Sequence, residues 1–187
     1  MTMHKKIIVI FVALIFILGV TFLATKESPK ESDFLSAYGL DQMNLKEIIS
    51  TLEQKLDEPS YFSASITGSK LYLGDDKDQI EIDLPKNVFY LSFAPYISKT
   101  HPCANHNLVT CRGELTNTSF YVTVTDINSN QIILDDTITS SANGFAGIWL
   151  PRNKHYRIEV SYQGFFASND ISTYNTSNTC LTTLKLT

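Results

Sequence analysis

Apolar and polar residues alternate with a period of two through most of the chain that follows Pro59. In the first of these runs, Phe62, Ala64 and Ile66 are separated by serines. Successive side chains of a β-strand point to opposite faces of a sheet, so this alternation is typical of strands with one buried face. Further strand-like runs, separated by Gly, Asn, Asp and Pro, occupy residues 71–73, 80–84, 88–97, 120–124, 131–138, 145–150 and 155–162. The pattern predicts a fold dominated by antiparallel sheet.

One amphipathic helix is predicted ahead of the strands. Asn44 is a residue type that caps the first turn of helices. Apolar residues then recur at helical spacing along one face, at Leu45, Ile48, Ile49, Leu52 and Leu56. A helix with such a stripe needs a sheet or another helix to cover it, so we expect it to pack on the strands.

The chain begins with an export or anchoring signal. Lys5 and Lys6 precede an uncharged and almost wholly apolar run from Ile7 to Thr25. A run of about eighteen such residues fits either a long signal peptide or a minimal transmembrane helix with its N-terminus inside. Small residues are poorly placed for a signal peptidase, which favours an uncleaved membrane anchor. The rest of the chain is therefore expected outside the cytoplasm, in a periplasm or on the outer face of the cytoplasmic membrane.

These features predict an α+β fold. It consists of an N-terminal export or anchor helix, a small helix-plus-β-hairpin region, and a C-terminal antiparallel β-sandwich-like domain that carries the cysteine site. The expected parts are a signal peptide or membrane anchor (1–25), a mobile polar tether (26–33), an N-terminal α+β region (34–97) and a C-terminal β-domain with the site (98–187). The apolar run from Val88 to Ile97 is expected to be a buried strand that leads into the site. The elements before Val88 are a candidate homodimer contact.

Charge and motifs exclude several classes of function. The net charge is −4, and no basic run follows the apolar segment that could track a phosphate backbone. Nucleic acid is therefore not expected as a partner, and the membrane is expected to be contacted only through the N-terminal segment. The sequence contains no nucleophile elbow, phosphate loop, dinucleotide-binding fingerprint or zinc-protease helix motif. An ordinary hydrolase is disfavoured.

The three cysteines are the first chemical clue. An odd number of thiols in an exported chain leaves at least one that is unpaired, shared with another molecule or bound to metal. Cys103 and Cys111 lie with His101 and His106 in a segment of eleven residues, and Cys180 follows near the C-terminus. Thiolates and imidazoles suit copper(I) or zinc, and the absence of a carboxylate cluster argues against calcium, magnesium and manganese. Copper is favoured over zinc because the cysteine spacing is not that of a short zinc knuckle.

The spacing also constrains the local structure. If residues 102–112 formed one helix, Cys103 and Cys111 would lie about 12 Å apart along its axis and could share neither a disulfide nor a metal ion. A common site therefore requires a loop or turn between them, with Cys180 brought in by pairing of the last strand. The alternative without metal is a structural disulfide between Cys103 and Cys111, with Cys180 buried and inert. His155 stands in a strand away from the cysteines and is expected to be an ordinary surface residue.

Five segments carry a combined pattern: Phe89–Tyr96 (FYLSFAPY), His101–His106 (HPCANH), Thr110–Leu115 (TCRGEL), Asn143–Arg152 (NGFAGIWLPR) and Thr179–Leu184 (TCLTTL). Together they resemble the CueP family of bacterial periplasmic copper-binding proteins, over residues 34–186. The resemblance implies copper resistance or copper handling outside the cytoplasm, including delivery of copper to a copper-zinc superoxide dismutase in some members. It implies Cys103, Cys111 and Cys180 as copper ligands. It also places His101 and His106 where the family has histidines, for binding copper(II) or tuning the thiols.

Three functions are open at this point. The first is a copper carrier that holds copper(I) on two or three thiolates and passes it on by stepwise ligand exchange. The second is a cupric reductase, in which Cys103 and Cys111 give two electrons to two copper(II) ions and become a disulfide. The third is a surface module with structural cysteines and no metal. A thiol–disulfide oxidoreductase is an expected partner in the first two, because an oxidising compartment would otherwise close the disulfide and remove two ligands.

Overall fold

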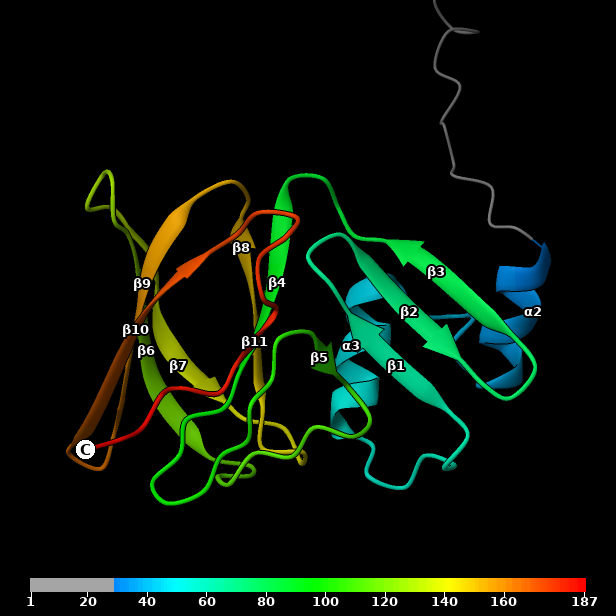
Figure 1. Cartoon of the computed structure of the whole chain (residues 1–187), viewed down its shortest axis with the longest axis horizontal. Coiled ribbons are helices and arrows are strands. Elements are labelled where there is room, and N and C mark those ends of the chain that lie inside the picture. Colours follow the sequence, from blue (N-terminus) through cyan, green and yellow to red (C-terminus); the bar gives the residue numbers. More distant parts are fainter. Residues whose placement is uncertain (1–28) are drawn as a thin grey trace, which may run out of the picture.

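The computed structural model describes residues 29–187. Within that range the chain forms two helices followed by eleven strands (Figure 1), namely α2 (Pro29–Ala37), α3 (Leu45–Gln54), β1 (Ser63–Ile66), β2 (Lys70–Gly74), β3 (Gln79–Asp83), β4 (Val88–Phe93), β5 (His106–Asn107), β6 (Ser119–Asp126), β7 (Ile132–Thr139), β8 (Ala146–Pro151), β9 (His155–Tyr162), β10 (Phe165–Ser172) and β11 (Cys180–Leu181). Almost all strand pairs are antiparallel, so the predicted α+β class is confirmed. The predicted signal or anchor lies outside the described residues. None of the helices between residues 29 and 187 has the length and apolar character that crossing a membrane requires.

Helix α3 begins where its sequence predicts. The Asn44 side chain accepts hydrogen bonds from backbone N–H groups of the first turn, and the Glu47 carboxylate accepts one from the Asn44 N–H in return. This capping box fixes the start of the helix. Leu52 lies fully buried on its inner face. The helix ends at Gln54, so Leu56, which was predicted on the apolar stripe, lies beyond it and is 52% exposed.

Helix α2 overlaps the segment that was predicted to be a polar tether, residues 26–33. The helix begins at Pro29, and proline is favoured in a first turn because its fixed backbone angle suits the helix. Phe34 and Leu35 on this helix are buried in the core. Their burial supplies the tertiary packing that holds a short polar segment in helical form. Residues 26–28 lie outside the described part of the chain.

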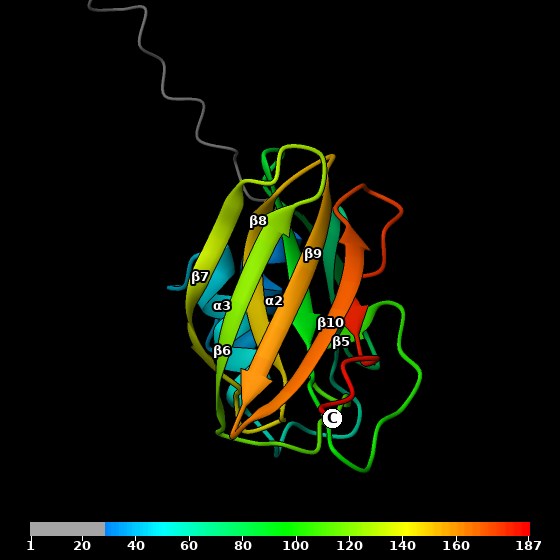
Figure 2. The same cartoon turned by 90° about the vertical axis from the view of Figure 1, so that its left-hand side faces the viewer.

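The strands form three sheets, in the orders β3-β2-β1-β5, β11-β4-β8 and β10-β9-β6-β7. The first sheet lies against α2 and α3, and apolar side chains from all of these elements form one core (Figure 1). The four strands of the third sheet run side by side across one end of the molecule (Figure 2). The second and third sheets share a second hydrophobic core. The second sheet therefore stands between the two cores.

Strand β4 supplies side chains to both cores. Phe89, Leu91 and Phe93 belong to the second core, whereas Tyr90 belongs to the first. Alternate side chains of a strand point to opposite faces, so a strand between two cores is apolar at most positions on both faces, and Ser92 is the polar exception in β4. The buried strand that was predicted within residues 88–97 is confirmed. Its two neighbours are β8, which is antiparallel to it, and β11, which is parallel.

The boundary predicted at residue 97 and the sandwich-like packing of residues 98–187 stay predictions. Strands from the two sides of this boundary share sheets. Strand β4 pairs with β8 and β11, while β5 pairs with β1 and sets His106 opposite Ile66. The two pairings bring the segment that contains His106 next to the first core and to α3 (Figure 1).

Candidate metal site

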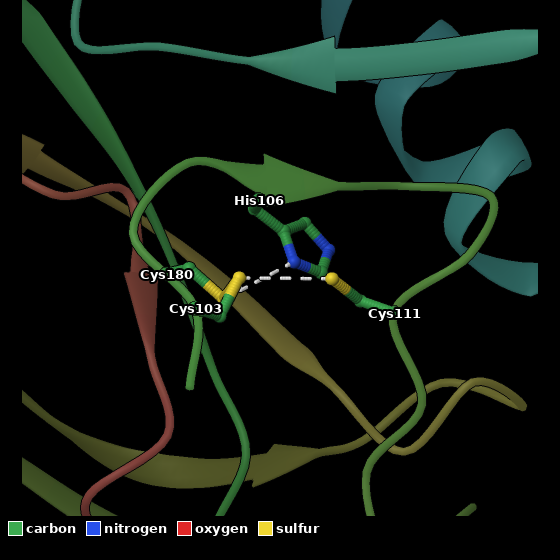
Figure 3. A group of neighbouring side chains, drawn as sticks. All are labelled: Cys103, His106, Cys111 and Cys180. Atoms are coloured by element: carbon green, nitrogen blue, oxygen red, sulfur yellow. Dashed lines mark hydrogen bonds between the residues drawn. A yellow bond between two sulfur atoms is a disulfide. The ribbon is translucent and has the colours of Figure 1, made fainter. Parts of the chain in front are cut away.

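Four side chains that can bind a metal ion converge where the sheets meet. They are Cys103, His106, Cys111 and Cys180, and their ligand atoms all lie within 4.8 Å of one another (Figure 3). Three of the four are buried, and Cys103 is partly exposed. His101, which was also predicted as a ligand, lies outside this group of four. The sequence-predicted residues are thus brought together except for one imidazole.

The loop from Cys103 to Cys111 folds back so that its two thiol groups meet. The segment is not helical, and the two Sγ atoms lie 3.7 Å apart. Asn107 makes the turn, because its side-chain oxygen accepts from the N–H groups of Val109 and Thr110 while its carbonyl accepts from the Cys111 N–H. An asparagine that bonds to the backbone two residues further on is a common turn device. The predicted loop or turn between the two cysteines is confirmed.

Cys180 arrives on the last strand, as predicted. Strand β11 pairs with β4 and sets Cys180 beside Ser92. The carbonyl of Ala104 accepts hydrogen bonds from the N–H groups of both Thr179 and Cys180, which ties the strand to the residue after Cys103. These contacts place the Cα atoms of Cys103 and Cys180 5.6 Å apart, within the ordinary range for a disulfide.

The disulfide of the structure joins Cys103 to Cys180, and the buried Cys111 is the free thiol. The predicted alternative, a Cys103–Cys111 disulfide beside an inert Cys180, is therefore wrong. Its basis was proximity along the chain, whereas the backbone bonds of β11 bring a residue 77 positions away into register. Cys180 is a member of the cluster and not a remote buried thiol.

His106 lies in the deepest part of the cluster. Its side chain is 0% exposed, and its ring centroid lies 4.5 Å from that of Phe145. Nδ1 faces the sulfur atoms (Figure 3) and lies 3.7 Å from Cys180 Sγ. Nε2 lies 3.0 Å from Oε1 of Glu53. The ring N–H is not well aligned on this oxygen, so the contact is an ion pair more than an ideal hydrogen bond. Burial opposes the charge, but the contacts with Cys111 and Glu53 outweigh it and raise the pKa of His106 to about 9.

Glu53 contacts the cluster through His106, and the sequence analysis missed it. It is 2% exposed and comes from α3, which lies on the other side of β4 from the second core. Its Oε1 accepts hydrogen bonds from the Tyr90 hydroxyl (2.7 Å) and the Ser92 hydroxyl (3.1 Å), and its Oε2 accepts from the Asn143 amide (3.0 Å). Burial would raise the pKa of this carboxyl group, but its contacts with His106, Tyr90 and Asn143 lower it, so Glu53 is ionised. The sequence did contain a signal for the burial of Glu53. It lies four residues after Ile49 and therefore on the same apolar face of the helix.

Cys111 is an acidified thiol. Burial opposes ionisation, but hydrogen bonds from His106 and His101 and from the Asn107 backbone lower its pKa from 9.0 to about 7. The Cys111 sulfur therefore needs no further deprotonation before it binds a metal ion, whereas the imidazolium of His106 must first release the proton on Nδ1.

The remaining histidines lie further out. His101 is half-buried, with its ring centroid 6.0 Å from that of Phe145, and it reaches the cluster through Cys111. His155 is exposed and packs edge-on against Tyr174, as expected for a surface residue.

Two glycines bring the Cys111 segment against the loop before β8. The Gly113 N–H donates to the Asn143 carbonyl at 2.7 Å, and a Cβ atom on either Gly113 or Gly144 would collide with the backbone of the other. Gly144 also has a φ of +83°, a conformation that other residues rarely adopt. This close approach places Asn143 and Phe145 beside His106, so the two glycines are needed for the packing of the site.

Two grooves lie near the cluster, and cluster residues line only the first. One, of about 520 Å³, is lined by Cys103, Cys180 and residues of β10 and the segment that follows it. The other, of about 400 Å³, is lined by Lys99, His101 and Arg112. The disulfide is therefore open to a partner from the first groove.

The fold and the cluster together define an α+β protein with a largely buried thiol–imidazole group that could hold a metal ion. The family model of the periplasmic copper-binding protein CueP matches residues 47–185, and the chain belongs to this family. A solved structure, described as the crystal structure of S.CueP, is 43% identical in sequence. The match covers 86% of this chain and 99% of that chain, with a TM-score of 0.80. No curated protein matches the chain significantly.

Proposed function

We propose that this protein binds copper(I) outside the cytoplasm through the thiolates of Cys103, Cys111 and Cys180, with the imidazole of His106 as a further ligand. The observation that carries the proposal is the convergence of these four ligand atoms within 4.8 Å in a member of a copper-binding family. His101, which contacts Cys111, would tune that thiol or bind copper(II). Copper resistance or copper handling would be the physiological role.

The donor set fits copper(I). Thiolates are soft ligands, and three of them in a poorly hydrated pocket suit a soft monovalent ion and keep it from dioxygen and peroxide. Three cysteines and one histidine also form a ligand set that zinc uses in closed structural sites. The family membership favours copper, and direct competition between the two metals tests this choice.

Metal binding would depend on the redox state of the disulfide. While Cys103 is bonded to Cys180, the cluster offers one thiol, Cys111, beside His106. Reduction would supply two more sulfur ligands at the same place. A thiol–disulfide oxidoreductase is the proposed partner, since both residues of the disulfide line the first groove and Cys103 is partly exposed there.

The first experiment is an anaerobic titration of the reduced full-length protein with copper(I), against a competing chelator and with a count of free thiols. We expect one copper(I) to bind tightly and to protect all three thiols. Cys103→Ser, Cys111→Ser and Cys180→Ser should each weaken binding by at least about tenfold, close to 1.4 kcal/mol. His106→Asn should also weaken binding, and His155→Ala is its matched control, because His155 lies on the surface beside Tyr174. If the Cys103→Ser, Cys180→Ser double variant bound copper(I) as tightly as the parent protein, the proposal would be contradicted. The alternative of a surface module with structural cysteines would then be favoured.

Copper delivery is a further part of the proposal. A copper-zinc superoxide dismutase is the proposed recipient, reached by stepwise exchange of the thiolates. Mixing the copper(I)-loaded protein with a copper-free dismutase should restore dismutase activity faster than the same amount of chelator-bound copper(I). If the two copper(I) sources restored dismutase activity at equal rates, the protein would be a copper(I) buffer and not a delivery protein.

A second candidate function is a cupric reductase, and the disulfide favours it. The thiolates of Cys103 and Cys180 would each give one electron to a copper(II) ion and form the bond seen in the structure, releasing two copper(I) ions. This pair replaces the predicted pair of Cys103 and Cys111. A thiol reductant should then sustain copper(I) formation far beyond two equivalents per protein. A single burst of two equivalents would indicate a carrier that is merely oxidised by copper(II).

A further inference from the structure

We propose that Glu53 is the positioning residue of the cluster: it holds the imidazole of His106 so that Nδ1 faces the three sulfur atoms. The inference rests on the proposed function, because it assigns a role within the same metal site. It concerns a residue from α3, which lies fifty positions before the cysteine segment along the chain.

The geometry of the ring gives each nitrogen a separate task. Nε2 lies 3.0 Å from Glu53 Oε1, and Nδ1 lies 3.7 Å from Cys180 Sγ. The Phe145 ring, whose centroid is 4.5 Å away, limits rotation of the imidazole plane. A ring fixed at Nε2 by an acceptor presents its other nitrogen in one direction, and here that direction leads to the sulfur atoms (Figure 3).

The Glu53 carboxylate is itself fixed by hydrogen bonds. Three donors from two other parts of the chain bind its oxygens, namely Tyr90 and Ser92 on β4 and Asn143 before β8. The same Asn143 accepts a hydrogen bond from the Phe145 N–H at 2.9 Å, so one residue positions both the carboxylate and the aromatic ring beside His106. Such a network fixes a ligand within the small tolerance that a metal site needs.

Cost is a second reason to assign a role to Glu53. Burying a carboxyl group removes it from water, which is unfavourable unless its hydrogen-bond partners compensate. Packing α3 on β4 needs no polar group at this position, because apolar side chains of similar size would fill the same space. A carboxyl group at 2% exposure that contacts the imidazole of the cluster is therefore explained by the site more than by the helix.

A purely structural ion pair is the competing explanation. A measurement on the metal-free protein tests whether Glu53 holds Nε2 of His106, and the copper(I) affinity then separates the two explanations. Imidazole ¹⁵N NMR of the reduced full-length protein should show His106 with a slowly exchanging Nε2–H, assigned by its loss in His106→Asn. In Glu53→Gln, which keeps the size of the side chain, this proton should exchange much faster. Glu58→Gln is the matched control, because Glu58 also has a mostly buried carboxylate but pairs with Lys55. Equally fast exchange in the parent protein overturns the proposal.

Copper(I) affinity in a double-mutant cycle completes the test. We expect Glu53→Gln to weaken binding by about 10- to 100-fold, as is usual when the partner of a metal-bound histidine is removed. In a His106→Asn background the same change should have no further effect. An equal loss in both backgrounds, or an affinity within twofold of the parent, overturns the positioning role. If the parent protein fails to bind copper(I), the proposed function falls, while proton exchange at Nε2 still decides whether Glu53 holds His106.

Discussion

The inner and outer sides of the cluster are held to very different degrees. On the inner side, His106 is packed against Phe145 and paired with Glu53, which is bound by three further donors. On the outer side, Cys103 is partly exposed in a groove, and its sulfur lies in contact with two other cysteines. The contrast teaches that one cluster can join a firmly held imidazole to sulfur atoms that a disulfide exchange can reach.

Removing the inner carboxylate should have the largest effect on stability. Glu53→Met leaves Tyr90, Ser92 and Asn143 buried without their acceptor and removes one of the two charged partners of His106, the other being Cys111. We expect the free energy of unfolding in urea to fall by about 4 kcal/mol. A loss below about 1 kcal/mol would show that the inner side is no more firmly held than an ordinary surface.

Opening the disulfide should have the next largest effect. Cys103 and Cys180 are separated by 77 positions, so their bond restricts a long loop of the unfolded chain. Reduction should lower the free energy of unfolding by about 3 kcal/mol. The comparison is best made in a Cys111→Ser background, where no other intramolecular disulfide forms. An unchanged unfolding midpoint after reduction would mean that the outer side contributes nothing to stability.

The helix that carries Glu53 offers a smaller change. Asn44→Ala removes the cap of α3 and should cost about 1 kcal/mol in urea unfolding. Because the helix stays packed through Leu52, the copper(I) affinity should change by less than about twofold. A large loss of affinity would mean that the position of Glu53 depends on the first turn of the helix and not on its own hydrogen bonds.

The effect of pH on stability should be close to zero between pH 7 and 9. The pKa of His106 is raised to about 9, so its contribution to stability is complete below its ordinary pKa of 6.5 and is lost as the pH rises through 9. The pKa of Cys111 is lowered to about 7, so its contribution is complete above its ordinary pKa of 9.0 and is lost as the pH falls through 7. Between these values the folded protein carries one proton on His106 and the unfolded chain carries one on Cys111, so the two effects cancel.

The oxidised protein makes this cancellation measurable, because Cys111 is then the free thiol. Its thiolate absorbance at 240 nm should rise with a midpoint near pH 7, while the free energy of unfolding stays constant within about 0.5 kcal/mol from pH 7 to 9. Cys111→Ser supplies the baseline absorbance. A midpoint near 9 would sink the assignment of a paired thiolate and imidazolium.

Sequence reasoning was most successful where local patterns decide the structure. Asn44 and the apolar stripe after it locate α3, and alternation locates most strands. The loop between Cys103 and Cys111 follows from the pitch of a helix alone. Strand β10 and helix α2 were missed, because β10 shows no clear alternation and α2 is held by the burial of Phe34 and Leu35.

Long-range partners were beyond the reach of the sequence. The pairing of Cys103 with Cys180 depends on the register of β11 on β4, which no local pattern fixes. Glu53 was missed because a single acid on an apolar stripe usually lies at its edge, and its partners are spread over β4 and the loop before β8. The cysteine and histidine residues of the cluster were found because their residue types are rare and their spacing is compact.

The position of the last strand determines the order in which the disulfide can mature. During synthesis, Cys103 and Cys111 emerge well before Cys180, and they lie close enough along the chain to meet at once. The partner that the fold selects, Cys180, becomes available only when β11 pairs with β4. The native disulfide can therefore form only after nearly the whole chain has been made. A chain truncated before Cys180 would leave Cys103 and Cys111 with only each other as intramolecular disulfide partners.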